Sequence, residues 1–142
     1  MNDYNLIYTN TWPFPAAVST KGVATSSIRK ITVSDTNQMF EDQFQWLKNA
    51  VETSKTAKNV VVTHHLPSLD LNPPEYKGNE VNAAFATHLN KFIEEHPQIN
   101  AWVCGHSHGV QQMKIGSTNC YMHCIGYFFE AKGRSYNCTF TV

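Results

Sequence analysis

Two short apolar runs, each followed at once by histidines, constrain this 142-residue chain more than any other feature. The first run is NVVV at 59–62, followed by THH at 63–65, and the second is AWVC at 101–104, followed by GHSHG at 105–109. Continuous apolar runs of this length are typical of central strands covered on both faces, which occur in layered α/β folds. Ligands of α/β sheets bind outside the carboxyl ends of strands, so both histidine segments are predicted to lie at such a site.

Imidazole side chains in this arrangement are suited to metal binding. A neutral imidazole is a good ligand for Zn, Mn, Fe or Ni, and histidines at positions i and i+2 of a turned segment can face one region. The glycines on either side of His106 and His108 permit a backbone turn that other residues would strain. A lone H-x-H or a lone His-His pair is a weak signal, but the two together after apolar strands predict a functional metal centre.

The surrounding pattern predicts further strands and helices. Residues 4–9 and 28–33 have strand composition, and a helix over 36–54, capped by Ser34 or Asp35, is expected to follow. The apolar stripe of this helix consists of Phe40, Phe44, Leu47 and Val51.

The segment between the two histidine groups is expected to be a loop and then a helix. Three prolines and a glycine predict a surface loop over 66–80. A second amphipathic helix should end near His96, because a following proline disfavours helical backbone. Its apolar stripe consists of Val81, Phe85, Leu89 and Phe92. The tail is expected to be rich in strands, over 111–115, 120–129 and 135–142 with a turn at 116–119, in a single domain over 1–142.

Composition excludes some classes of partner. Eleven Lys and Arg residues balance eleven Asp and Glu residues, which argues against binding nucleic acid or a membrane surface by bulk charge. No apolar run approaches a membrane span and the first residues lack a signal-peptide pattern, so we expect a cytoplasmic protein. The four cysteines, at 104, 120, 124 and 138, are then expected to be reduced thiols.

The two histidine motifs also carry a family resemblance. VVVTHHLPS at 60–68 followed by VCGHSHG at 103–109 resembles the last two motif blocks of the calcineurin-like metallophosphoesterases. The flanking MFEDQFQWLKNAVE at 39–52 and GYFFE at 126–130 fit that comparison, which extends from about Tyr4 to the end of the chain. The resemblance implies an α/β fold, half of a layered β-sandwich flanked by helices.

The resemblance also implies a site and a reaction. His64 and His106 would bind one divalent metal ion and His108 a second, with Mn, Fe, Zn or Ni as the candidate metals. His65 would line the site without an assigned catalytic role. The implied reaction is hydrolysis of a phosphomonoester or phosphodiester substrate by metal-bound hydroxide.

Carboxylate blocks of the family have no counterpart here. The sequence lacks D-x-H, G-D-x-x-D and G-N-H, and its aspartates are Asp3, Asp35, Asp42 and Asp70. A two-metal site needs a bridging group to hold the ions about 3.5–4 Å apart. We therefore expect the C-terminal part of the domain, with the N-terminal half absent, so that activity needs a second chain or an N-terminal segment. An exposed sheet edge would join that complementing chain or self-associate.

Two alternatives stay open at this stage. The chain could be a catalytically inactive remnant that serves as a binding or assembly subunit. It could also be a small zinc module, although the spacing of its residues matches no common zinc finger. The ligands of such a module would come from Cys104, His106, His108, Cys120, His123 and Cys124. Without such a module, His88 and His96 are expected to be solvated or capping residues and His123 a strand residue.

Overall fold

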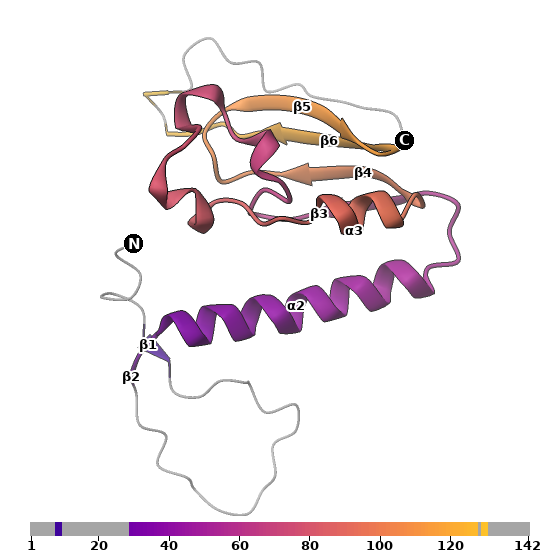
Figure 1. Ribbon diagram of the computed structural model, residues 1–142, viewed down its shortest axis with the longest axis horizontal. Helices are drawn as coiled ribbons and strands as arrows, with labels where there is room; N and C mark the ends of the chain where they lie inside the picture. The colour runs from indigo at the N-terminus through magenta and orange to yellow at the C-terminus, as the bar shows by residue number, and fades with distance from the viewer. Residues whose placement is uncertain (1–7, 10–28, 128, 131–142) are drawn as a thin grey trace, which may run out of the picture. The chain divides into compact units, whose positions relative to one another are not determined.

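The computed structural model of the protein describes residues 8–9, 29–127 and 129–130 (Figure 1). Contacts within the chain define two units, Met1–Ala50 and Val51–Val142. The single-domain organisation expected for the whole chain stays a prediction. Across the described ranges, none of the helices combines the length and the apolar character that crossing a bilayer requires.

The first unit pairs two very short strands. Strand β1 (Tyr8–Thr9) runs antiparallel to β2 (Arg29–Lys30). The strand expected over 28–33 is therefore wrong beyond Lys30, because the chain turns there into a helix. Residues 4–7, also expected to be strand, lie outside the described residues, as do 135–142.

Helix α2 (Val33–Thr53) begins three residues earlier than the sequence pattern indicates, and neither Ser34 nor Asp35 is the cap. The Thr32 hydroxyl accepts from the Asp35 N–H at 3.4 Å, and the Asp35 carboxylate accepts from the Thr32 N–H at 2.7 Å. This reciprocal pair is a capping box, which satisfies two N–H groups at the helix start. Arg29 adds a bidentate ion pair to Asp35, with both N–O distances at 2.6 Å.

The second unit is built on a four-stranded mixed sheet with the order β3-β4-β6-β5 (Figure 1). Strand β3 (Asn59–Val62) is parallel to β4 (Ile99–Cys104), which is parallel to β6 (Thr118–His123). Strand β5 (Val110–Ile115) joins antiparallel to β6. The mixed α/β architecture confirms the predicted fold class.

The two apolar runs occupy different places in this sheet. Neighbouring residues Ala101 and Trp102 of β4 point to opposite faces and both are fully buried, so β4 is the doubly covered strand that was predicted. Strand β3 lies at the edge, where Val61 is buried but Val60 and Val62 are 45% and 72% exposed. The prediction of a doubly covered strand is therefore wrong for β3.

The segment after β3 departs most from the sequence pattern. The loop expected on the surface over 66–80 begins with a buried half, which consists of Leu66, Pro67, Ser68, Leu71, Asn72 and Pro73. It contains two short 3-10 helices, η1 (Leu69–Leu71) and η2 (Pro74–Tyr76). Only 74–80 is continuously exposed.

The prediction of a long second helix is also wrong. The chain forms a 3-10 helix, η3 (Glu80–Ala84), and only later a short α-helix, α3 (Asn90–Glu95). Between them, the Thr87 N–H donates to the Leu66 carbonyl and the Leu89 N–H to the Pro67 carbonyl, each at 2.9 Å. Backbone groups engaged in this long-range pairing cannot take part in a helix, although the apolar spacing suits one.

The last described elements form a hairpin. Gly116 makes the β5–β6 turn with a φ of 57°, a conformation that glycine adopts without a steric penalty. The turn is shorter than expected, because β6 already begins at Thr118, and β6 ends at His123 rather than continuing to 129.

Candidate metal centre

The two histidine segments meet because β3 and β4 are parallel neighbours. Backbone pairing continues past both strands, since the Thr63 N–H donates to the Val103 carbonyl and the Gly105 N–H to the His64 carbonyl, each at 3.0 Å. His64 and His106 therefore leave the sheet side by side at its carboxyl edge, where the sequence predicts a site.

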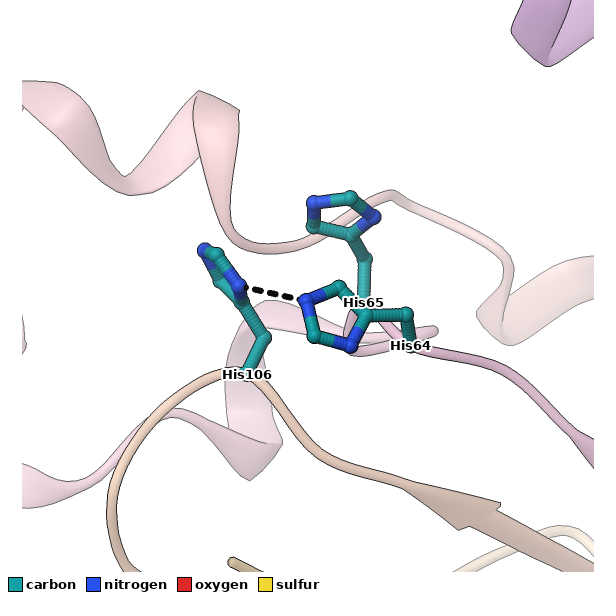
Figure 2. Close-up of side chains that lie close together, drawn as sticks. All are labelled: His64, His65 and His106. Carbon is teal, nitrogen blue, oxygen red and sulfur yellow. Dashed lines mark hydrogen bonds between the residues drawn. The ribbon is translucent and has the colours of Figure 1, made fainter. Parts of the chain in front are cut away.

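Three imidazoles come together at this edge. The Nε2 of His64 lies 2.9 Å from the Nδ1 of His106, and Figure 2 shows these two rings facing each other across that hydrogen bond, with His65 beside them. The His65 ring centre lies 5.0 Å from that of His64 and 4.7 Å from that of His106. His64 and His65 are exposed and His106 is half-buried. We call His64, His65 and His106 the histidine cluster.

A hydrogen-bond relay fixes the turn that carries His65. The indole N–H of Trp102, buried in β4, donates to the Thr63 hydroxyl at 2.9 Å. That hydroxyl donates in turn to the His65 carbonyl at 2.7 Å. The relay links the sheet interior to the backbone of the cluster, so the position of His65 depends on a buried side chain.

The backbone of His106 is itself unusual. Its φ is 66°, in the left-handed region that non-glycine residues rarely adopt. The flanking Gly105 and Gly109 are not among the glycines with positive φ, so the strained conformation expected of them falls on the histidine instead. Gly109 lies in a tight place, since a Cβ there would lie 3.0 Å from Pro73 Cγ and 3.3 Å from Met122 Cε.

The surroundings of His65 favour its neutral form. Protein atoms packed around the ring remove part of its hydration and lower its pKa, and neighbouring His64 lowers that pKa further. A neutral imidazole keeps a lone pair available to a metal ion. The family resemblance implied that His65 lines the site, and gave it no ligand role. The chain bends after Thr63, and both rings then reach the cluster.

His108 has a different partner. Its Nδ1 lies 2.7 Å from a carboxylate oxygen of Glu130, which also accepts from the Tyr127 N–H at 2.8 Å. The Tyr127 ring meets the His108 ring edge-on, with centres 4.6 Å apart. Carboxylates commonly hold metal-binding histidines in this way, by fixing the tautomer that leaves the second nitrogen free to bind. Sequence reasoning did not single out Glu130.

The cluster fits a divalent metal ion in its donor chemistry. Its three ligand nitrogens lie within 4.8 Å of one another. Two imidazole nitrogens that bind one tetrahedral ion at about 2.0–2.1 Å are roughly 3.3 Å apart, close to the 2.9 Å between His64 and His106. Among the described residues, no carboxylate belongs to the cluster. The donor set therefore suits metals that accept imidazole, and it adds no negative charge.

The cysteines do not support the zinc-module alternative. Cys104 and Cys120 are buried in the sheet, where loss of hydration raises the pKa of Cys104 to about 12 and that of Cys120 to about 11. A thiol must lose its proton to bind zinc, so this environment opposes metal binding. In the described part of the chain, the metal-binding group that the geometry brings together contains histidines alone.

The remaining histidines have ordinary surroundings. The Nδ1 of His96 lies 2.7 Å from the Phe92 carbonyl, as expected for a residue that caps α3. His88 is exposed between η3 and α3, and His123 lies at the end of β6.

Comparisons with known proteins agree with the resemblance seen in the sequence. The family model for calcineurin-like phosphoesterases matches residues 3–110, a range that includes all four histidines of the two motifs. The chain is also similar to an uncharacterized protein of Acanthamoeba polyphaga mimivirus, with 26% identity over 137 residues. That alignment covers 92% of this chain but only 43% of the length of the viral protein. By its match to the family model over most of its length, the chain belongs to the calcineurin-like phosphoesterase family.

Proposed function

We propose that this chain supplies the histidine ligands of a divalent-metal site that hydrolyses phosphoesters. The convergence of His64, His65 and His106 at the carboxyl edge of the sheet carries the proposal, because family membership alone does not place a ligand. Three imidazoles within reach of one ion are the arrangement that such chemistry needs from this part of the fold.

Each histidine has a distinct proposed role. His64 and His106 would hold one ion, and His65 is the third donor within reach of it. His108, held by Glu130, would contribute to a second ion. Divalent ions supply a Lewis acid that neutralises phosphate charge and lowers the pKa of water. The protein's own part is to hold these rings in position around the ion.

The charge balance supports a requirement for further chain. Neutral imidazoles alone leave the full charge of two divalent ions uncompensated, and a bridging carboxylate is the usual group between such ions. We therefore propose that carboxylate ligands come from a second chain or from an N-terminal segment. Among the described residues β3 is the last strand on its side of the sheet, and a strand of a complementing chain could pair with it there.

Metal binding by the full chain tests the ligand roles directly. Mn²⁺ and Zn²⁺ occupancy should fall in His64→Ala, His106→Ala and His108→Ala, as measured by native mass spectrometry. His88→Ala is the matched control, because His88 is exposed and lies outside the histidine cluster. Wild-type occupancy in all three variants would refute the ligand assignment.

The same experiment addresses the complementing chain. Protein purified from its own source with metal present should carry a companion chain and two bound divalent ions. It should then hydrolyse p-nitrophenyl phosphate or its bis ester in a metal-dependent way. A bare chain or a self-oligomer without stoichiometric metal would instead identify an inactive assembly subunit.

A further inference from the structure

Phe85 is an aromatic residue that the sequence pattern assigns to a helix and that the structure places against the histidine cluster. Its ring centre lies 4.5 Å from that of His106, and the two ring planes are inclined by 48°. Aromatic rings at this separation attract each other beyond the effect of the area that they bury. His106 therefore has a ring neighbour that offers no ligand atom of its own.

Hydrogen bonds fix the backbone that carries this ring. The Phe85 N–H donates to the Asn82 carbonyl at 2.9 Å, and the Phe85 carbonyl accepts from the Leu66 N–H at 3.0 Å. A parallel bridge between Leu66 and Ala86 continues this pairing, and both of these side chains are buried. Because Leu66 directly follows His65, the bridge ties Phe85 to the segment that supplies the rest of the cluster.

The surroundings of Phe85 differ from those of a core residue. Phe85 is half-buried, whereas core residues of the same unit such as Leu66, Ile93 and Trp102 are at most 1% exposed. The apolar spacing of this segment suits a long helix, but the chain forms the bridge at Leu66 instead. The Phe85 ring is therefore held at the margin of the core, where it contacts a candidate metal ligand.

His106 is the member of the cluster whose position needs the most support. Its φ of 66° is a conformation that residues with a side chain rarely adopt. Its Nδ1 must also point at the Nε2 of His64 for their 2.9 Å hydrogen bond to form. The imidazole can rotate about two side-chain bonds, and such a rotation turns Nδ1 away from His64. A second ring packed against the imidazole limits that rotation.

We propose that Phe85 is a positioning residue, which orients the Nδ1 of His106 toward the other rings of the histidine cluster. It acts through His106 and binds neither the ion nor the substrate. The inference rests on the proposed function for the ion that the cluster would hold. Metal-binding histidines are usually oriented by hydrogen bonds from carboxylates, carbonyls or water, and here an apolar ring contact performs that task.

The orientation of His106 can be measured in the metal-free full chain. Nuclear Overhauser effects between ring protons of His64 and His106 report whether the two imidazoles face each other. Phe85→Leu and Phe85→Met remove the aromatic ring but keep an apolar side chain, so one folded variant is sufficient. These effects should be weaker in both variants than in the wild type. Phe85→Tyr keeps the ring and should restore the wild-type spectrum.

The Zn²⁺ affinity shows whether this orientation matters for the ion. In calorimetry, Phe85→Leu should bind Zn²⁺ about 2–10-fold more weakly than the wild type, the size of one aromatic contact, and Phe85→Tyr should bind as the wild type does. Phe92→Leu is the matched control, because Phe92 packs against His96 with ring centres 4.2 Å apart and His96 lies outside the cluster. It should lose stability but keep its Zn²⁺ affinity at a temperature where all variants are folded.

The outcomes separate this inference from the proposed function. Unchanged Overhauser effects in Phe85→Leu, or equal losses of Zn²⁺ affinity in Phe85→Leu and Phe92→Leu, would overturn the positioning role. Failure of Phe85→Tyr to restore the orientation would overturn it as well. Weakened Overhauser effects in Phe85→Leu, with no Zn²⁺ bound even by the wild type, would support the orientation of His106 and refute the proposed ligand role. Zn²⁺ binding that Phe85→Leu leaves unchanged would refute the inference and leave the proposed function standing.

Discussion

Replacing Thr63 with valine should test whether the fold itself positions the histidine cluster. The Thr63 hydroxyl accepts from the buried Trp102 indole at 2.9 Å and donates to the His65 carbonyl at 2.7 Å. Valine keeps the shape of threonine but removes both bonds. The loss of the bond to His65 costs about 1 kcal/mol, and leaving a buried indole N–H unsatisfied costs about 1–3 kcal/mol. We expect a loss of about 2–4 kcal/mol in the free energy of unfolding.

Urea denaturation of five proteins, the wild type and four variants, measures this effect and its cause. Thr63→Ser keeps the hydroxyl and is the control for Thr63→Val. Trp102→Phe removes the donor but also leaves a cavity, so its own cost is not informative. Combining it with Thr63→Val in a double-mutant cycle cancels the cavity term and isolates the coupling between the two side chains. We expect a coupling energy of about 1–2 kcal/mol, because the double variant no longer has an orphaned N–H.

Zn²⁺ binding gives a second measurement, because the same hydrogen bonds that stabilise the fold also hold the turn at His65. If the relay holds the turn at His65, Thr63→Val should also bind Zn²⁺ more weakly than Thr63→Ser at a temperature where both are folded. Two results would refute the reasoning. One is a free energy of unfolding for Thr63→Val within about 0.5 kcal/mol of that for Thr63→Ser, and the other is a coupling energy near zero.

Three further predictions concern other parts of the chain. Gly109→Ala should lower the free energy of unfolding by about 1–3 kcal/mol in urea denaturation, because its Cβ would lie 3.0 Å from Pro73 Cγ. Gly105→Ala is the control, since its Cβ would lie 3.8 Å from the His64 carbonyl oxygen. Glu130→Gln should weaken metal binding by about 10–100-fold and change the His108 tautomer in ¹⁵N NMR spectra, whereas an unchanged tautomer would refute the positioning role of Glu130. The Arg29 guanidinium, followed by the hydrogen bonds from Thr32, lowers the pKa of Asp35 below its ordinary value of 3.8. The stabilising effect of the ionised Asp35 carboxylate should therefore be present above pH 3.8 and be lost as the pH falls below that value. Circular dichroism should show a smaller acid-induced loss of helix in Asp35→Asn than in the Asp42→Asn control.

The sequence predicted the place of the site better than the path of the chain around it. An apolar run ending in histidines indicates a strand end, and two such runs become neighbours when their strands are parallel, as β3 and β4 are. The stripe from Val81 to Phe92 was misleading because its period matches a helix, while Thr87 and Leu89 pair with residues 66 and 67. Pairing partners distant in sequence leave no trace in local periodicity.

The side chains that contact the candidate histidines were harder to predict than the histidines themselves. Glu130 follows His108 only after a complete hairpin, and no local motif connects the two. The family resemblance placed His65 beside the site and not among its ligands. The bend held by Thr63 and Trp102 decides its position, and that bond crosses from β4 to the loop after β3. Such contacts depend on the register of the sheet, which the sequence does not specify by itself.

The donor chemistry of the histidine cluster differs from that of a carboxylate cluster. Neutral imidazoles do not repel one another as carboxylates do, so His64 and His106 can share a hydrogen bond at 2.9 Å. The left-handed backbone of His106 costs about 1–3 kcal/mol, which the surrounding fold must offset. Adding carboxylates to the same cluster without metal would introduce repulsion between their negative charges and the cost of removing them from water. In the proposed complex, the carboxylate-bearing segment should therefore join more tightly when divalent ions are bound, and chelation should weaken its association.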